Sequence, residues 1–304
     1  MLSIETAEII CKITFSQPAL ADVYPAFVLR SVFGYYLRRM HCVTHDNDCS
    51  VCVFRKTCAY ARVFESIIDK STPVLPGRDK ASHPFRIIAD AKPGTTLQSL
   101  TARIQFFGSG IDYIPHTIFA LREAGKAGLF RARIPYTLSV FAGNNVPIEH
   151  GDTIELDAIP RTTHHVTTDT VTCNKTYTVQ CKTPVRFRHN GKHSDNFLAS
   201  DFLTACMRRV QTLAGLYGTT QVSGGTTDHN DIQADITNRQ LRWIDYTRYS
   251  VRQQTAIKLG GVVGSFTVSG TAPAYLWQAL ETCSYIGTGK NTSFGFGNIE
   301  VTEE

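Results

Sequence analysis

Apolar residues follow two different periods along this chain, and the periods predict which segments are strands and which are helices. An apolar residue at every second position is typical of a strand, and one at every third or fourth position is typical of a helix that buries one face. In the first half the pattern predicts strands over residues 3–15, 85–90, 97–107 and 129–140, and helices over 22–40 and 112–124. The face that the first helix is predicted to bury consists of Ala26, Leu29, Phe33, Leu37 and Met40. The order of the elements is therefore β-α-β-β-α-β.

The second half repeats this order. Strands are predicted over residues 176–188, 239–248, 257–269 and 292–302, and helices over 195–217 and 273–285. In the first of these strands Tyr177, Val179 and Cys181 alternate with polar residues, which indicates one buried face. The β-α-β-β-α-β order is that of the ferredoxin-like motif. The sequence therefore predicts an α+β fold of two tandem ferredoxin-like, RRM-like (βαββαβ) domains with antiparallel sheets.

The repeat also predicts where the domains begin and end. We expect an N-terminal domain over residues 1–145, with a cysteine-rich insert at about 41–80, and a C-terminal domain over 176–304 with a glycine-rich loop. Residues 146–175 are rich in Thr, Asn, Gly and His, and we interpret them as a linker. A strand-like run at 153–158 adds one further strand to this linker.

Composition narrows the class of protein. The 304 residues suffice for two domains, and a hydrophobic content of 42% with only 19% charged residues argues against disorder. A net charge of +5 permits a nucleic-acid partner without requiring one. Two open antiparallel sheets resemble the platform of RNA-recognition modules, although this topology serves many unrelated functions.

The chain contains no run of about 18 apolar residues, so we expect no membrane span and no membrane partner. Its first residues carry acids and no basic region, which is unlike a signal peptide. A cytoplasmic location is therefore expected, and there the nine cysteines would be reduced or bound to metal.

Glycine-rich turns stand at matching points of the two halves. Residues 287–297 read Gly-Thr-Gly-Lys-Asn-Thr-Ser-Phe-Gly-Phe-Gly, and a shorter Gly-Lys-Ala-Gly turn occupies residues 125–128. Glycine lacks a Cβ, so its N–H group can approach an anion closely. The spacing fits neither a Walker A loop nor Gly-x-Gly-x-x-Gly. The alternatives are a grip on a nucleic-acid phosphate and a tight connection without a ligand. The residues expected to bind phosphate are Gly287, Gly289, Lys290, Ser293, Gly295 and Lys126.

Residues 246–264 interleave cations with aromatic side chains. Arg248, Arg252 and Lys258 supply the positive charge, and tyrosines at 246 and 249 supply faces on which bases can stack. The alternative is a hairpin with a solvated basic face. Three glycines in the second predicted strand, at 260, 261 and 264, indicate a close approach of another backbone or a ligand.

The cysteine-rich insert has the spacing Cys42-x6-Cys49-x2-Cys52-x5-Cys58. Four thiolates so close in sequence, around a Cys-x2-Cys core, can form a tetrahedral metal site. A structural zinc ion is the first candidate and an iron–sulfur cluster the second. The alternative is free thiols, because the Cys-x2-Cys pair has no second partner pair.

Several segments together resemble one known family. They are Leu29–Arg39, Cys58–Glu65, Phe107–Gly108, Tyr113–Pro115, Gly125–Arg133, Thr183–Arg186, Arg248–Gly264 and the final glycine loop. In order and spacing they resemble the CRISPR repeat-processing endoribonuclease family of the RAMP superfamily. The resemblance spans nearly the whole chain.

This resemblance implies an endoribonuclease that cuts CRISPR precursor RNA within its repeats and keeps the processed guide RNA bound. It implies metal-independent cleavage by the ribose 2′-hydroxyl, with 2′,3′-cyclic phosphate and 5′-hydroxyl products and no cofactor required for catalysis. The implied partners are CRISPR repeat RNA and other subunits of a CRISPR effector complex. The competing functions are a non-catalytic RNA-binding subunit of such a complex and an unrelated ferredoxin-like enzyme that binds a small phosphate ligand.

In this family the active histidine tends to lie in or just after the first helix, where this chain has two. The resemblance therefore points first to His45, in a polar loop, and then to His41, directly after the helix. Tyr36 is a candidate to assist the reaction, and Arg38 and Arg39 are candidates to bind the RNA phosphate. The clustered histidines His164, His165, His189 and His193 are expected to be solvated in loops.

Overall fold

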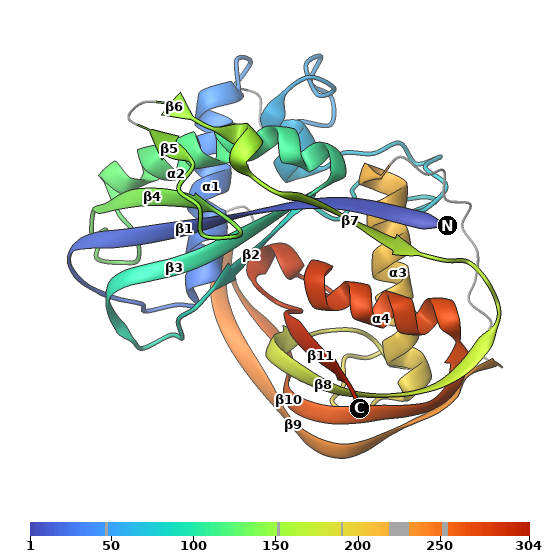
Figure 1. Ribbon diagram of the computed structural model, residues 1–304. Coiled ribbons are helices and arrows are strands. Elements are labelled where there is room, and N and C mark those ends of the chain that lie inside the picture. The colour runs from blue at the N-terminus through green and yellow to red at the C-terminus, as the bar shows by residue number, and fades with distance from the viewer. Residues whose placement is uncertain (46–47, 151–152, 190, 219–230, 251–254) are drawn as a thin grey trace. The chain divides into compact units, whose positions relative to one another are not determined.

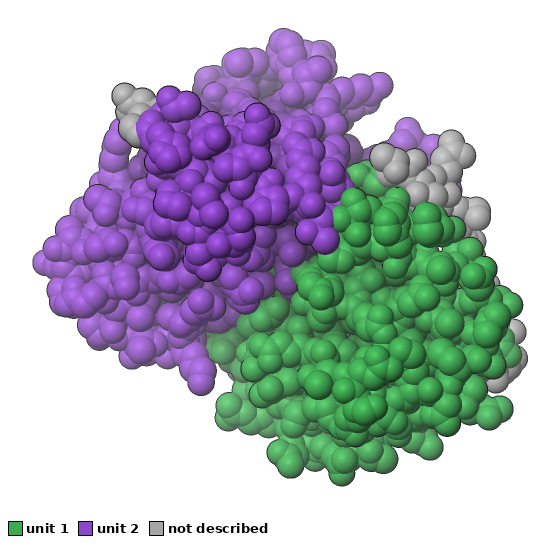
Figure 2. Space-filling view, viewed as in Figure 1, with its two compact units in different colours: residues 1–4, 163–304 green, residues 5–162 purple. Residues whose placement is uncertain are grey.

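The structure is a computed structural model that describes residues 1–45, 48–150, 153–189, 191–218, 231–250 and 255–304. The chain divides into two compact units, residues 1–4 with 163–304 (unit 1) and residues 5–162 (unit 2) (Figure 2). The division lies between Thr162 and Thr163, inside the segment that the sequence predicts as a linker. None of the described helices is long and apolar enough to span a membrane.

Unit 2 is built on one antiparallel sheet with the strand order β2-β3-β1-β4 (Figure 1). Its strands are β1 (Leu2–Leu20), β2 (Phe85–Ala89), β3 (Thr96–Phe107) and β4 (Tyr136–Ala142), and its helices are α1 (Pro25–His41) and α2 (Ile114–Ala127). The short strands β5 (Glu149–His150) and β6 (Thr153–Ile154) form a separate pair, and β7 (Arg161–Val166) pairs with β1.

Unit 1 repeats this arrangement in the strand order β11-β8-β10-β9. Its strands are β8 (Thr172–Val185), β9 (Gln233–Ser250), β10 (Thr255–Pro273) and β11 (Ile299–Glu303), and its helices are α3 (Ala199–Tyr217) and α4 (Ala274–Ile286). In both units the first and third strands are central, and the element order is β-α-β-β-α-β. The predicted α+β fold of tandem ferredoxin-like domains with antiparallel sheets is confirmed.

The core of unit 2 lies between its sheet and its two helices, which pack against each other. Ala26, Leu29, Phe33 and Leu37 of α1 are buried, as the helical period predicts. The prediction for Met40 was wrong, because its residue is 43% exposed. The helix ends one residue later, at His41, and the chain then enters the cysteine-rich segment.

The core of unit 1 is centred on aromatic rings. Phe266 of β10 makes edge-to-face contacts with Phe197 and Phe202, at centroid distances of 5.4 and 5.0 Å. Tyr177, Val179 and Cys181 are buried on β8, which confirms the alternation seen in the sequence. The glycine at 264 also has the predicted close neighbour, because a Cβ there would lie 2.0 Å from the carbonyl oxygen of Gln240.

Two predicted strands begin later than expected. Residues 129–135 form a reversed turn closed by the Leu129–Ile134 bridge, and β4 begins at Tyr136. Residues 292–294 form a short 3₁₀ helix, and β11 begins at Ile299. In both places residues with positive φ interrupt the extended chain, which apolar periodicity alone does not reveal. The strand expected at 153–158 is likewise only Thr153–Ile154, followed by a 3₁₀ turn.

The turn that precedes β11 depends on glycine. Gly297 has a φ of +77°, and a Cβ there would lie 2.0 Å from the Thr288 carbonyl oxygen. Gly191 in the same unit has nearly the same φ, +76°, but no atom within 4 Å of the added Cβ. Substitutions at the two positions therefore distinguish the effect of backbone strain from that of a steric clash.

We predict that Gly191→Ala lowers the free energy of unfolding by about 1 kcal/mol, because alanine is strained at positive φ. Gly297→Ala should lower it by about 2–4 kcal/mol, because overpacking adds to the same strain. Urea denaturation followed by circular dichroism measures both values on the same unit. Equal losses for the two variants would contradict the close contact at residue 297.

Candidate functional site

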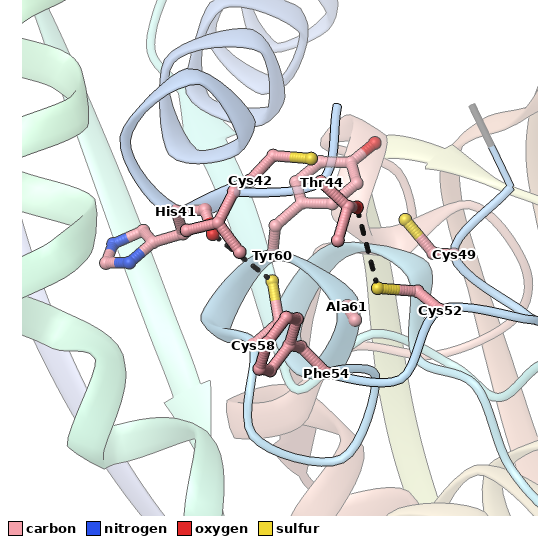
Figure 3. Close-up of a pocket in the computed structure, with 10 residues that line it drawn as sticks. His41, Cys42, Thr44, Cys49, Cys52, Phe54, Cys58, Tyr60 and Ala61 are labelled. Carbon is pink, nitrogen blue, oxygen red and sulfur yellow. Dashed lines mark hydrogen bonds between the residues drawn. The ribbon is translucent and has the colours of Figure 1, made fainter. Parts of the chain in front are cut away.

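Two histidines meet where α1 ends and α2 begins. His41 is the last residue of α1 and His116 lies in the first turn of α2. Their ring centroids are 4.9 Å apart, and the ring of Tyr113 lies 5.4 Å from that of His116. In Figure 3 the His41 ring points away from the cysteine sulfurs. The packing of two helices thus joins residues that are far apart in sequence.

The surroundings of this pair favour the neutral form of both imidazoles. Burial lowers the pKa of His41, and the neighbouring His116 lowers it further. Burial also lowers the pKa of His116. The Nε2 atom of His41 and the Nδ1 atom of His116 are buried, and neither has a hydrogen-bond partner within the described part of the chain. A neutral ring with an unpaired nitrogen can accept a proton, which is what a general base requires.

Sequence reasoning missed His116. The signal was present, because a ferredoxin-like order places its two helices side by side, and the residue follows the proline that opens the second helix. Only the packing shows that the two helix ends meet at their histidines. Arg62 adds a cation nearby, with its guanidinium carbon 5.8 Å from the centre of the Tyr113 ring.

The other two residues predicted for catalysis lie elsewhere. His45 is exposed in the loop between Cys42 and Cys49, with a φ of +55°, and it borders residues outside the described ranges. Tyr36 precedes His41 by five residues, which places it about 140° around the helix axis. Its ring makes an edge contact with Tyr35 at 5.1 Å. Neither side chain is brought to the histidine pair.

The two arginines at the end of α1 have different surroundings. The Arg38 side chain hydrogen-bonds Cys42, and its guanidinium carbon lies 5.8 Å from the centre of the Tyr60 ring. Arg39 is exposed to solvent. The first arginine therefore belongs to the surroundings of the cysteine-rich insert, and the second faces solvent.

The four cysteines of the insert line one cavity, together with Thr44, Phe54 and Tyr60 (Figure 3). All four are free thiols that are partly exposed. Within the described residues no three side chains of Cys, His, Asp or Glu stand close enough together to hold a metal ion without movement.

In unit 1, several arginine and lysine side chains lie around the glycine loop. Burial lowers the pKa of His193. The hydrogen bond between its Nδ1 atom and the Phe187 carbonyl raises this pKa, and the positive charges of Arg186, Lys290 and Arg188 lower it. These three cations therefore all lie near His193, and the Lys290 amide donates to the Arg186 carbonyl at 2.7 Å. Arg248 of β9 joins the same loop, with its guanidinium carbon 4.5 Å from the centre of the Phe294 ring. We call Arg186, Arg188, Arg248 and Lys290 the loop cluster.

Two members of the loop cluster show incomplete hydrogen bonding. The Nε atoms of Arg186 and Arg248 are buried and have no partner among the described residues. Burial also lowers the pKa of Arg248. Guanidinium groups with unused donors suit the binding of phosphate. The sequence predicted that Arg248 and Lys290 bind RNA. It did not predict this role for Arg188, which lies in no recognisable motif.

The glycine loop positions these cations, and several of its N–H groups are used in backbone hydrogen bonds and are not free to bind a phosphate. Its amides at Thr288, Lys290 and Gly297 donate to the carbonyls of Gly297, Arg186 and Pro184, at 2.9, 2.7 and 2.9 Å. The remaining residues predicted here are folded into the same turn: Gly287 caps α4, Gly289 and Gly295 take positive φ, and Ser293 is buried. The Lys290 side chain is exposed.

The other predicted RNA-binding residues are dispersed. Lys126 is exposed and pairs with Glu123 at 2.6 Å. Lys258 is exposed on β10, opposite Thr247 of β9. Arg252 lies outside the described residues. The glycines at 128 and 287, which end α2 and α4, do occupy equivalent positions in the two units.

Comparisons with known families and structures indicate what this chain is similar to. The family model AF_1859_N, described as an N-terminal domain, matches residues 4–157, and the model described as CRISPR-associated endoribonuclease Cas6 matches residues 179–299. No curated protein matches the sequence significantly.

Solved structures have the same fold. A Cas6 product complex is similar with a TM-score of 0.55 and 15% identity, and the match covers 98% of this chain and 100% of that one. Thermus thermophilus Cas6 is similar with a TM-score of 0.54 and 12% identity, over 98% and 99% of the two chains. A partial Cas6-RT-Cas1–Cas2 complex has a TM-score of 0.53 and 12% identity, over 99% of this chain and 46% of that one.

The first family model covers half of the chain, and the Cas6 model covers most of the second ferredoxin-like unit. Both matches agree with the resemblance that the sequence segments carry. The chain therefore belongs to the CRISPR repeat-processing RAMP family, of which the Cas6 endoribonucleases are members.

Proposed function

We propose that this protein cleaves CRISPR precursor RNA within its repeats by a metal-independent reaction, and that it keeps the processed RNA bound. The observation that carries the proposal is the pair formed by His41 and His116, whose buried nitrogens have no partner in the described part of the chain. Family membership supplies the substrate class. The loop cluster supplies a place for the RNA backbone.

The reaction needs three things from the protein. A base removes the proton of the ribose 2′-hydroxyl, and the oxygen then forms a bond to the adjacent phosphorus. The bond from phosphorus to the 5′-oxygen breaks, and that oxygen takes up a proton from an acid. A cation stabilises the negative charge that develops on the phosphate oxygens. The products are a 2′,3′-cyclic phosphate and a 5′-hydroxyl, and the nucleophile comes from the RNA itself.

We assign the base to His41 rather than to His45. The His41 ring is held at a helix end against a second imidazole, so it has a defined position, which proton transfer requires. His45 is exposed in a loop, and no contact with another described residue orients its ring. His116 is the second proton-transfer group, because its ring packs against that of His41. Our candidates for the cation are Arg62, whose guanidinium carbon lies 5.8 Å from the centre of the Tyr113 ring, and the exposed Arg39.

The RNA backbone binds to the loop cluster in unit 1. Four cations around one turn give a high local positive charge, whereas Lys126 is already paired with Glu123. Related solved structures are named as a Cas6 product complex and as a Cas6-RT-Cas1–Cas2 complex. By analogy with these structures, we propose repeat RNA and other CRISPR proteins as partners of this chain.

The first test replaces the histidines one at a time. His41→Ala should lower the rate of repeat cleavage by about 10²–10⁴-fold, because general-base catalysis contributes about that much. Binding of the same RNA should persist, and His116→Ala should show the same separation. Cleavage is measured in single turnover on labelled repeat RNA, and binding is measured by anisotropy on RNA with a 2′-deoxy substitution at the cut site.

His45→Ala is the matched control and should cleave at a rate close to that of the unchanged protein. Loss of cleavage in His45→Ala with full activity in His41→Ala would move the base to the loop. If the unchanged protein binds repeat RNA but never cuts it, the function is that of a non-catalytic RNA-binding subunit.

The second test concerns metal independence and product chemistry. Cleavage should continue when Mg²⁺ is omitted and EDTA is added with the RNA, because the proposed reaction uses only side chains and the 2′-hydroxyl. Mass spectrometry of the fragments should show cyclic phosphate on one end and a hydroxyl on the other. Activity that EDTA abolishes and Mg²⁺ restores would contradict the proposed reaction.

The third test concerns the loop cluster. Lys290→Ala should weaken RNA binding and make the slope of log affinity against log salt shallower by about 1, because one phosphate contact is lost. Arg186→Ala should act in the same direction. Lys182→Ala is the control, since its ammonium group already pairs with Glu300 at 2.8 Å in the same unit. An unchanged slope in both cluster variants would place the RNA elsewhere.

A further inference from the structure

The cysteine-rich insert has a feature that the proposed cleavage does not use. Cys42 directly follows α1, and Cys58 directly precedes the helical turn that contains η1 (Ala61–Glu65). Cys49 and Cys52 lie in the loop between these two ordered ends. All four line the same cavity, and Figure 3 shows their sulfur atoms placed around it.

The loop has little else to stabilise it. Its described residues between Cys42 and Cys58 form turns and bends but no helix or strand. Val43, Val51 and Val53 are 70%, 72% and 84% exposed, so they contribute little to a hydrophobic core. Loops of this length without secondary structure are uncommon in compact domains unless something else orders them. A segment with four cysteines and few buried apolar contacts is typical of folds that depend on a metal.

Two of the four sulfurs have neighbouring hydrogen-bond donors, whereas the Cys58 thiol donates to the His41 carbonyl at 3.9 Å. The Arg38 side chain hydrogen-bonds Cys42. The Thr44 hydroxyl lies 3.8 Å from the Cys52 sulfur and can donate to it. A metal ion with charge +2 bound by four thiolates has a net charge of −2, which a nearby guanidinium and hydroxyl would stabilise.

We propose that Cys42, Cys49, Cys52 and Cys58 bind one structural zinc ion as a tetrahedral tetrathiolate site. Each thiol that binds releases its proton to solvent, and nothing is oxidised or reduced. The sulfurs move toward the ion, because as they stand no three ligands among the described residues are close enough to share it. The loop can make this movement, since no strand or helix restrains it. The bound ion would tie the end of α1 to the start of the next helical turn.

Zinc content is the direct test and does not depend on RNA cleavage. Full-length protein purified under reducing conditions without chelator should contain about one zinc ion per chain by mass spectrometry. Replacing the zinc with Co²⁺ should give the visible absorption bands of tetrahedral cobalt and a sulfur-to-cobalt charge-transfer band in the near ultraviolet. These bands identify both the geometry and the thiolate ligands.

Variants locate the site. Cys49→Ser and Cys52→Ser should each lose most of the zinc and the cobalt–sulfur band, and the unfolding temperature should fall. Cys173→Ser is the matched control, because that cysteine is also a partly exposed free thiol but lies on β8 of unit 1. It should keep the full zinc content. If the loop variants fail to fold, the cobalt spectrum of the unchanged protein still tests the proposal.

Three results would overturn it. The first is protein without zinc that takes up neither zinc nor cobalt when they are supplied in equal amount. The second is iron and acid-labile sulfide in the purified protein, which would mean an iron–sulfur cluster. The third is disulfide bonds between these cysteines under reducing conditions, detected by peptide mapping.

Discussion

The contact between α1 and α2 is the constraint on which the proposed chemistry depends. Each helix buries an apolar face against the sheet of unit 2, so the end of α1 and the start of α2 are fixed relative to that sheet. The imidazoles of His41 and His116 meet only because of this packing. Their burial follows from the same contact, and burial favours their neutral form. Hydrophobic packing therefore places the groups and also prepares their protonation state.

Much of the fold could be read from the sequence, because its apolar periods match the elements that form. The order of helices and strands in both units follows from these periods, and so does the buried face of β8. Two of the predicted strands begin late because of residues with positive φ, as at Phe130 and Gly297, where a turn replaces the expected start of the strand. A pattern of apolar residues describes which side faces the core, but it carries no information about φ.

The site was harder to predict than the fold. The family resemblance pointed first to His45 and then to His41, and the glycine loop pointed to Lys290. The surroundings of His116 and Arg188 come instead from contacts between distant segments. The glycine loop shows the limit of reading a motif by composition. Its glycines suggested free N–H groups for a phosphate, but the amides at 288, 290 and 297 are used inside the turn. The glycine loop therefore positions a cation.

The glycines that end α2 and α4 stand at equivalent points of two modules, each with its own sheet and its own core. After the first glycine the chain enters a turn beside a lysine neutralised by Glu123, and after the second it enters the loop cluster. Duplicated modules that have diverged in this way can accumulate substitutions separately. Under the proposed function, one module would adapt to a changed RNA repeat while the other kept its histidine pair.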